Sequence, residues 1–330
     1  MGIKDVAKRA GVSVATVSYY INGTKNVSPR SAEKIRQAIQ KTGYRPNLVA
    51  RGLRTNENKV IAVLIQDITS GYYNRVLEGI AQVLYQHGYG VSLCITWNNP
   101  EYELRDFHNM ISRQVSGVIM TPIDPGRDFR ALCPTPDFPL VFMDRLQKGT
   151  AADVVLCDNY NVTYRAITTL IQRGRRRIAY FYSVSVDNVS TTSDRLRAYR
   201  TALQDSGLPV DEHLIAFSRT PNASYSMMES LFADENPPDA VFIASSRMAF
   251  GVLRYLQKHH ISVPEDVALI NFDDYDWAEI TAPKPLSTIR QPATEMGQTV
   301  AQLMLDRLQA PAVSYRTVML DSQIVERGSF

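Results

Sequence analysis

The 330-residue sequence has few cysteines and no long hydrophobic run. Its three cysteines, Cys94, Cys133 and Cys157, are odd in number and have no metal-binding spacing, so we expect buried free thiols in a reducing compartment. No apolar stretch is long enough to span a membrane, and the N-terminus lacks the apolar segment of a signal peptide. These absences predict a cytoplasmic protein with no membrane partner, associated with the nucleoid only when bound to DNA.

Sequence motifs of common enzymes are also missing. The chain contains no nucleophile elbow, P-loop, zinc-binding spacing or glycine-rich dinucleotide turn. Its five histidines, His87, His108, His213, His259 and His260, are scattered, and none pairs with a candidate nucleophile. We therefore predict a protein that is not an enzyme and uses no cofactor or metal.

Charge is distributed unevenly along the chain. Residues 1–59 hold 12 Lys and Arg against 3 Asp and Glu, a net charge of +9. Residues 60–330 hold 24 against 30, a net charge of −6. A basic segment joined to an acidic body indicates that the basic segment contacts phosphate, although a solvated charged surface is the alternative.

The basic segment predicts three short helices. Apolar residues recur at helical spacing, and Gly11, Asn22-Gly23 and Gly43 mark the three helix ends. Ser13 can cap the second helix and Ser28 the third. Three short helices with a glycine-containing turn between the first two are typical of a helix-turn-helix DNA-binding domain.

In such a domain the start of the second helix enters the major groove. Val14 and Ala15 can pack on thymine methyl groups, and Tyr19 can hydrogen-bond a base or a phosphate. The alternative for Val14 is packing within the domain. The predicted DNA contacts are Lys4, Ser13, Val14, Ala15, Thr16, Ser18, Tyr19 and Asn22.

Three segments of this region, residues 3–18 (IKDVAKRAGVSVATVS), 21–23 (ING) and 44–53 (YRPNLVARGL), together resemble the headpiece of the LacI/GalR family of bacterial transcription regulators. The resemblance implies a helix-turn-helix headpiece over 1–45 and a hinge helix over 46–59. It also implies a homodimer on a near-palindromic double-stranded operator. Many members carry Arg at the position of Tyr19, so the operator should differ there.

The hinge contains a glycine, Gly52, which makes a short helix less stable by ~1 kcal/mol. The family resemblance implies that the segment folds only when two copies pair on DNA, with Leu53 inserted into the minor groove. The alternative is an inert tether. The predicted hinge contacts are Asn47, Ala50, Leu53 and Arg54.

From Val60 onward, apolar strands alternate with helices. This pattern predicts an α/β core of parallel sheets, and the resemblance implies two doubly wound subdomains like those of periplasmic binding proteins. The effector-binding and dimerisation core would span 60–330, with helices on its flank such as 73–84 at the dimer interface. We expect an N-subdomain over about 60–157 and 291–319, and a C-subdomain over about 158–290 and 320–330.

Ligands of parallel sheets lie beyond the carboxyl ends of the strands, and several polar or aromatic side chains fall there. Positions 144, 195 and 273 match effector contacts of the family by resemblance, while Ser245-Ser246 replaces the Asn-Asp of many members. Arg195 could instead form an interdomain salt bridge, and Trp277 could pack in the core. The predicted effector contacts are Asp67, Tyr72, Tyr73, Asp144, Arg195, Ser245, Asp273 and Trp277. The two tyrosines are included because neighbouring loop residues cannot both face a core.

The sequence therefore predicts a DNA-binding transcription regulator, most simply a repressor, controlled by a small carbohydrate effector. A constitutive regulator without an effector, or one with a non-sugar corepressor, is the alternative. A binding protein for transport would need a secretion signal. The C-terminal residues carry no heptads, so a coiled-coil tetramer is not expected.

Overall fold

The computed structural model describes residues 2–22, 25–44, 58–147, 149, 151–183, 189–218, 220–281 and 284–330. The chain divides into two units, Met1–Lys59 and Val60–Phe330, which we call the headpiece and the core. Within the described residues, no helix combines the length and the apolar character needed to cross a membrane.

The headpiece contains the three predicted helices. They are α1 (Ile3–Ala10), α2 (Val14–Asn22) and α3 (Pro29–Thr42). Val6, Val17 and Ile35 come from different helices and are fully buried together, so the three helices share one small core. The helical spacing of apolar residues therefore predicted this unit correctly.

The signals at the helix ends act as the sequence predicts. The Ser13 hydroxyl accepts a hydrogen bond from the backbone N–H of Thr16 at 3.1 Å, which caps α2. Ser28 caps α3 in the same way. Gly11 and Gly43 adopt left-handed backbone angles, with φ of +65° and +61°.

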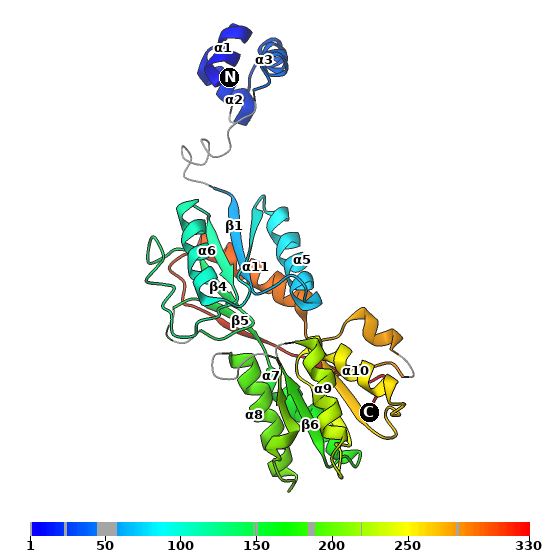
Figure 1. Ribbon diagram of the computed structural model, residues 1–330. Coiled ribbons are helices and arrows are strands. Elements are labelled where there is room, and N and C mark those ends of the chain that lie inside the picture. The colour runs from blue at the N-terminus through cyan, green and yellow to red at the C-terminus, as the bar shows by residue number, and fades with distance from the viewer. Residues whose placement is uncertain are drawn as a thin grey trace. The chain divides into compact units, whose positions relative to one another are not determined.

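The core is built on two six-stranded sheets (Figure 1). The first has the order β11-β5-β4-β3-β1-β2, and the second has the order β12-β10-β9-β8-β6-β7. All neighbouring strands pair in parallel except β12, which runs antiparallel to β10. The strands are β1 (Val60–Ile65), β2 (Gly90–Ile95), β3 (Gly117–Met120), β4 (Leu140–Met143), β5 (Asp153–Cys157), β6 (Ile178–Tyr182), β7 (Ile215–Phe217), β8 (Ala240–Ile243), β9 (Ala268–Phe272), β10 (Ser287–Arg290), β11 (Thr317–Leu320) and β12 (Gln323–Val325).

Helices cover both faces of each sheet, as the predicted fold class requires. On the first sheet, α5 and α11 pack on one face and α6 on the other; on the second, α7 and α8 lie opposite α9 and α10. The helices are α5 (Gly71–Gln86), α6 (Pro100–Ser112), α7 (Asn159–Gln172), α8 (Ser190–Asp205), α9 (Pro221–Phe232), α10 (Ala249–Lys258) and α11 (Ala293–Gln309).

The alternation of buried residues along β1 explains the two layers. Ile61, Val63 and Ile65 point to the α5/α11 side, while Ala62 and Leu64 point to the α6 side. All five are fully buried, so the strand reads as one continuous apolar run.

Some elements differ from the sequence prediction. α8 begins at Ser190, four residues before the predicted start, because its first turn is Ser-Thr-Thr-Ser, a segment of weak helix propensity. The prediction missed β7, α9, β10, α11, β11 and β12. The strands are only three or four residues long, and the buried residues of α11 surround the helix rather than forming one stripe.

The chain passes between the two sheets three times. β5 in the first sheet is followed by α7 on the second, β10 in the second by α11 on the first, and β11 in the first by β12 in the second. These crossings bring the carboxyl ends of the strands of both sheets to the same cleft.

Candidate functional site

The first candidate site is the exposed start of α2 in the headpiece. Val14 is 40% exposed, and Ala15 beside it is also exposed, so neither side chain is used to fill the headpiece core. Lys4 on α1 is exposed as well. Tyr19 is half-buried, and the Lys25 ammonium lies 5.0 Å from the centre of its ring. These side chains leave an apolar tip and cations free for a nucleic acid.

The remaining predicted contacts of this surface differ in what the structure describes. The hydroxyls of Ser13 and Thr16 lie 2.8 Å apart, so they are hydrogen-bonded to each other at the start of α2. Ser18 is half-buried on the same helix. The side chain of Asn22 lies outside the described residues, as do the predicted hinge contacts Asn47, Ala50, Leu53 and Arg54.

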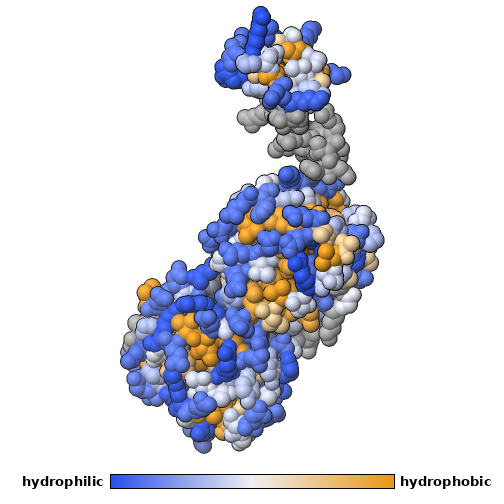
Figure 2. Space-filling view, turned by 180° about the vertical axis from the view of Figure 1, so that it is seen from behind, coloured by the Kyte–Doolittle hydropathy of each residue, from blue (hydrophilic) through white to orange (hydrophobic). Residues whose placement is uncertain are grey.

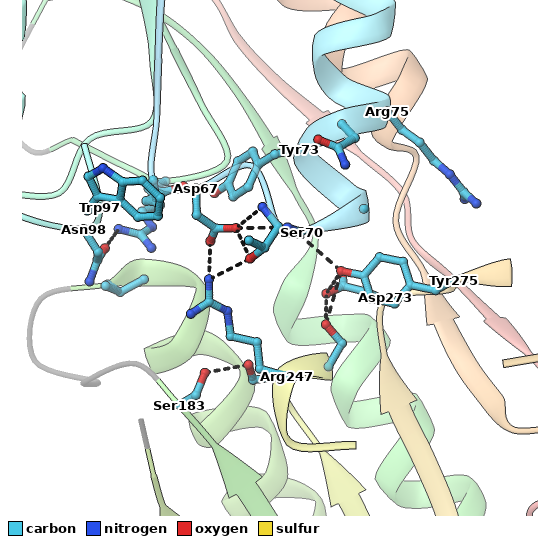
Figure 3. Close-up of a pocket in the computed structure, with 18 of the residues that line it drawn as sticks. Asp67, Ser70, Tyr73, Arg75, Trp97, Asn98, Ser183, Arg247, Asp273 and Tyr275 are labelled. Atoms are coloured by element: carbon cyan, nitrogen blue, oxygen red, sulfur yellow. Dashed lines mark hydrogen bonds and ion pairs between the residues drawn. The ribbon is translucent and has the colours of Figure 1, made fainter. Parts of the chain in front are cut away.

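The second candidate site is a cleft of about 1080 Å³ in the core, at the carboxyl ends of the strands. Both sheets contribute to it, because Gln66 and Asp67 follow β1 while Ser245 and Asp273 follow β8 and β9. Figure 3 shows these side chains converging from the two sides. Five predicted effector contacts line the cleft: Asp67, Tyr73, Ser245, Asp273 and Trp277.

Asp67 joins the two sides of the cleft. One carboxylate oxygen accepts hydrogen bonds from the N–H groups of Thr69 and Ser70, both at 2.9 Å, which fixes the turn before α5. The other oxygen lies 2.6 Å from the guanidinium of Arg247, a residue of the opposite side (Figure 3). A ligand between the two sides must accommodate or displace this ion pair.

Asp273 has the strained backbone of a residue fixed in place for binding, with φ of +74°. Its carboxylate accepts hydrogen bonds from Gln291 at 2.6 Å, Ser246 at 3.2 Å and Tyr275 at 3.4 Å. Burial raises the pKa of Asp273, and the positive charge of Arg195 lowers it in part. The carboxylate therefore lies among hydroxyl and amide donors, a suitable acceptor for a ligand hydroxyl.

The prediction for Tyr72 and Tyr73 needs correction. Both residues lie in the first turn of α5 rather than in a loop, and both are buried, at 7% and 8% exposure. Neighbouring helical residues are about 100° apart, so a broad apolar stripe can bury both. Tyr73 still lines the cleft, whereas Tyr72 does not.

Asp144 and Arg195 also differ from their predicted placement, because neither lines the cleft. Asp144 is 7% exposed and accepts a hydrogen bond from the Tyr73 hydroxyl at 2.8 Å. Arg195 donates to the Asn159 side chain at 2.8 Å and to the carbonyl of Ala244 at 2.9 Å. These side chains hold residues beside the cleft, and Arg195 forms no interdomain salt bridge among the described residues.

Trp277 lies at the edge of the cleft rather than wholly in the core. It is half-buried, and its ring packs on Phe250 with centroids 4.8 Å apart and on Tyr275 at 6.0 Å. Ser245 is hydrogen-bonded to Ser183 with 2.6 Å between their hydroxyl oxygens. The C-terminal side of the cleft therefore offers aromatic faces beside short hydroxyl side chains.

Several cleft residues were not among the predicted contacts: Trp97, Arg145, Arg247, Phe250 and Tyr275. All except Phe250 fall within three residues of a strand end, so the rule that placed Asp67 and Asp273 could have found them. Among the described residues, no group of three or more His, Cys, Asp or Glu side chains could hold a metal ion.

Comparison with known proteins connects the two sites. Residues 2–47 match the model "Bacterial regulatory proteins, lacI family", and residues 167–330 match "Periplasmic binding protein-like domain". The chain is 31% identical over 330 residues to the HTH-type transcriptional repressor PurR of Vibrio atlanticus, covering 99% of this chain and 98% of that protein. The chain belongs to the LacI family. It is therefore an effector-regulated, DNA-binding transcriptional repressor.

Other members of the LacI family agree over the whole length. The ribose operon repressor of Escherichia coli K12 is 30% identical over 333 residues, covering 99% of both chains. The solved complex of the transcriptional regulator CelR with cellobiose is 27% identical, covers both chains fully and has a TM-score of 0.74. These relatives are named as transcriptional regulators rather than enzymes.

Proposed function

We propose that this LacI-family chain represses transcription as a homodimer on a near-palindromic operator, and that a carbohydrate bound in the core cleft changes its affinity for that operator. The observation that carries the proposal is the Asp67–Arg247 ion pair, because it spans the cleft between the two sheets. A ligand that enters the cleft meets this contact and therefore favours a different arrangement of the two sides.

The DNA-binding side of the proposal rests on the start of α2. Val14 and Ala15 are exposed apolar side chains that would contact thymine methyl groups and exclude other bases by shape. Lys4 and the hydroxyls of Ser13, Thr16 and Ser18 would bind phosphates, together with Asn22. Tyr19 lacks the bidentate guanidinium that reads guanine, so it would select a different base or contact a phosphate.

The hinge completes the proposed DNA-binding surface. Leu53 would insert into the minor groove at the centre of the operator, where an apolar wedge opens a base step at a cost of a few kcal/mol. Asn47, Ala50 and Arg54 would contact the backbone on either side. A flexible central base step would lower the cost of bending.

The cleft supports a carbohydrate as the effector. Asp67 and Asp273 are acceptors for sugar hydroxyls, and the Trp277 ring is a flat apolar face for a pyranose. The likeness to a regulator solved with cellobiose and to a ribose operon repressor favours the same class of ligand. Asp144 and Arg195 would act by holding Tyr73 and Asn159 rather than by touching the effector.

The proposed dimer would use the flank of the core next to α5. The inner residues of this helix, including Val76, Ile80 and Leu84, are buried within the same chain. Tyr85 at its end is 65% exposed, and Leu93 on the edge strand β2 is 43% exposed. Figure 2 shows hydrophobic side chains gathered in separate patches on a largely hydrophilic core surface. Exposed apolar residues of this kind mark candidate contact surfaces.

Operator binding measured with and without sugars tests the effector part of the proposal. Fluorescence anisotropy of a labelled operator should change in midpoint on addition of a bound sugar. Asp273→Asn should abolish that change while leaving operator affinity without sugar as it was. Asp234→Asn, an exposed carboxylate outside the cleft, is the control.

The competing function is constitutive DNA binding without an effector. It would give the same operator midpoint with every sugar, for the original chain and for Asp273→Asn alike. Equal sugar responses of the two chains would remove Asp273 from the site without removing the effector.

A further inference from the structure

The arginines that line the cleft differ in their charge partners. Arg247 is paired with Asp67 at 2.6 Å, and Arg75 is paired with Asp276 at 2.7 Å. Arg145 also lines the cleft but takes part in none of the ion pairs found among the described residues. Its charge is therefore not balanced by a carboxylate within 4 Å in the part of the chain that the structure describes.

Arg145 is a buried cation held by neutral groups. The residue is 7% exposed, and its guanidinium donates to the side-chain oxygen of Asn98 at 3.1 Å. The Gln66 amide, oriented so that its nitrogen donates to the Tyr73 hydroxyl, accepts from Arg145 at 3.2 and 3.3 Å. Because removing a charge from water is costly without a counter-charge, such a position favours an incoming anion.

The carboxylates around Arg145 are already engaged by other donors. Glu103, which is fully buried, accepts hydrogen bonds from the backbone N–H groups of Ile123 at 2.7 Å and Asp124 at 3.4 Å. Burial raises the pKa of Glu103 to about 7, so it carries only part of a charge at neutral pH. Asp144 accepts from the hydroxyl of Tyr73.

Trp97 lies on the same side of the cleft, directly before Asn98. It is 60% exposed, and the two residues have φ angles of +53° and +55°. Two consecutive residues in the left-handed region are costly, and such strain concentrates at binding sites. Figure 3 shows Trp97 and Asn98 together on the left, away from Asp273 and Tyr275. An aromatic face and a buried cation are thus joined through Asn98.

We propose that the effector is a saccharide with an acidic group, a carboxylate or a phosphate, which Arg145 binds while the Trp97 ring stacks on the sugar. This assignment rests on the proposed function of the cleft and specifies its ligand class. The planar guanidinium fits both acids, because it offers parallel N–H donors to two oxygens. Asp273 and Trp277 on the other side would bind the remaining hydroxyls and ring.

Matched pairs of neutral and acidic sugars test the assignment. Isothermal titration of the full chain would compare glucose with glucuronate and glucose 6-phosphate, galactose with galacturonate, and cellobiose with cellobiuronate. We expect one acidic member to bind about 10- to 100-fold more tightly than its neutral partner, the factor for one charged hydrogen-bonded contact. Preference for the uronate identifies a carboxylate ligand, and preference for the 6-phosphate identifies a phosphate ligand.

Arg145→Gln should lose that preference, and Arg145→Lys should keep part of it. Arg254→Gln, which replaces an exposed arginine outside the cleft, should bind like the original chain. A thermal unfolding midpoint for each variant separates loss of binding from loss of folding. Trp97→Ala should weaken neutral and acidic sugars by the same factor.

The outcomes distinguish the two levels of the proposal. Neutral sugars that bind as tightly as their acidic partners, or an acidic sugar whose affinity survives Arg145→Gln, would overturn the acidic ligand and leave the carbohydrate effector intact. A panel in which no sugar binds would overturn both.

Discussion

Replacing Arg307 by methionine should destabilise the core strongly, because it removes the cation from a fully buried ion pair. The side chains of Arg307 and Asp153 are 2% and 0% exposed, and the guanidinium donates to Asp153 at 3.0 and 2.8 Å. It also donates to the carbonyls of Pro311 and Val313. The pair joins the end of α11 to β5 and to the segment leading into β11.

The magnitude follows from what the substitution leaves behind. Asp153 would keep the backbone N–H of Arg316 at 2.9 Å and a weaker contact with its side chain at 3.5 Å. A buried carboxylate that loses its main partner costs about 3–5 kcal/mol. For a unit of this size, that cost corresponds to a fall in Tm of roughly 6–20 °C.

Arg316→Met is the matched control. Its guanidinium is paired with Asp306 at 2.8 Å, but the two side chains are 39% and 38% exposed. Water screens such a pair, so the expected loss is at most about 1 kcal/mol. Urea unfolding followed by far-ultraviolet circular dichroism would measure both variants. Equal losses in free energy of unfolding for Arg307→Met and Arg316→Met would refute the reasoning.

Three further predictions concern the core and the hinge. Burial raises the pKa of Glu103 from 4.5 to about 7, so wild-type stability should fall as pH rises across that interval; Glu103→Gln should flatten the decline in urea midpoints, and an unchanged slope would contradict this. Gly297→Ala should cost about 1–3 kcal/mol in the same assay, since its Cβ would collide with the Val76 carbonyl, whereas Gly126→Ala should cost little. Leu53→Ala should weaken operator binding at least tenfold, given the few kcal/mol of a wedge, without changing effector affinity; unaltered operator affinity would rule out the wedge.

The headpiece was predictable because its signals are local. Ser13, Ser28, Gly11 and Gly43 determine helix ends through their own hydrogen bonds and backbone angles, and the structure confirms each one. The buried strands of the core were equally readable, since a strand covered on both faces is a continuous apolar run. Elements such as β7 and β12, three residues long, contain too little pattern to detect.

The cleft was predictable only in part. Strand ends located Asp67, Ser245 and Asp273, because that rule depends on topology alone. The same rule failed for Asp144, which turns to accept from a buried tyrosine. The reach of Arg247 across the cleft depends on how the two subdomains face each other, and no local pattern encodes that arrangement.

Selection of bound fragments from a random duplex pool, using the full chain, tests the central claim most directly. The account predicts enrichment of a near-palindrome with two half-sites, followed by a salt dependence of log affinity with a slope of about −0.9 per neutralised phosphate. Failure to enrich any sequence, or enrichment of a single half-site without its symmetry mate, would contradict a dimeric sequence-specific repressor.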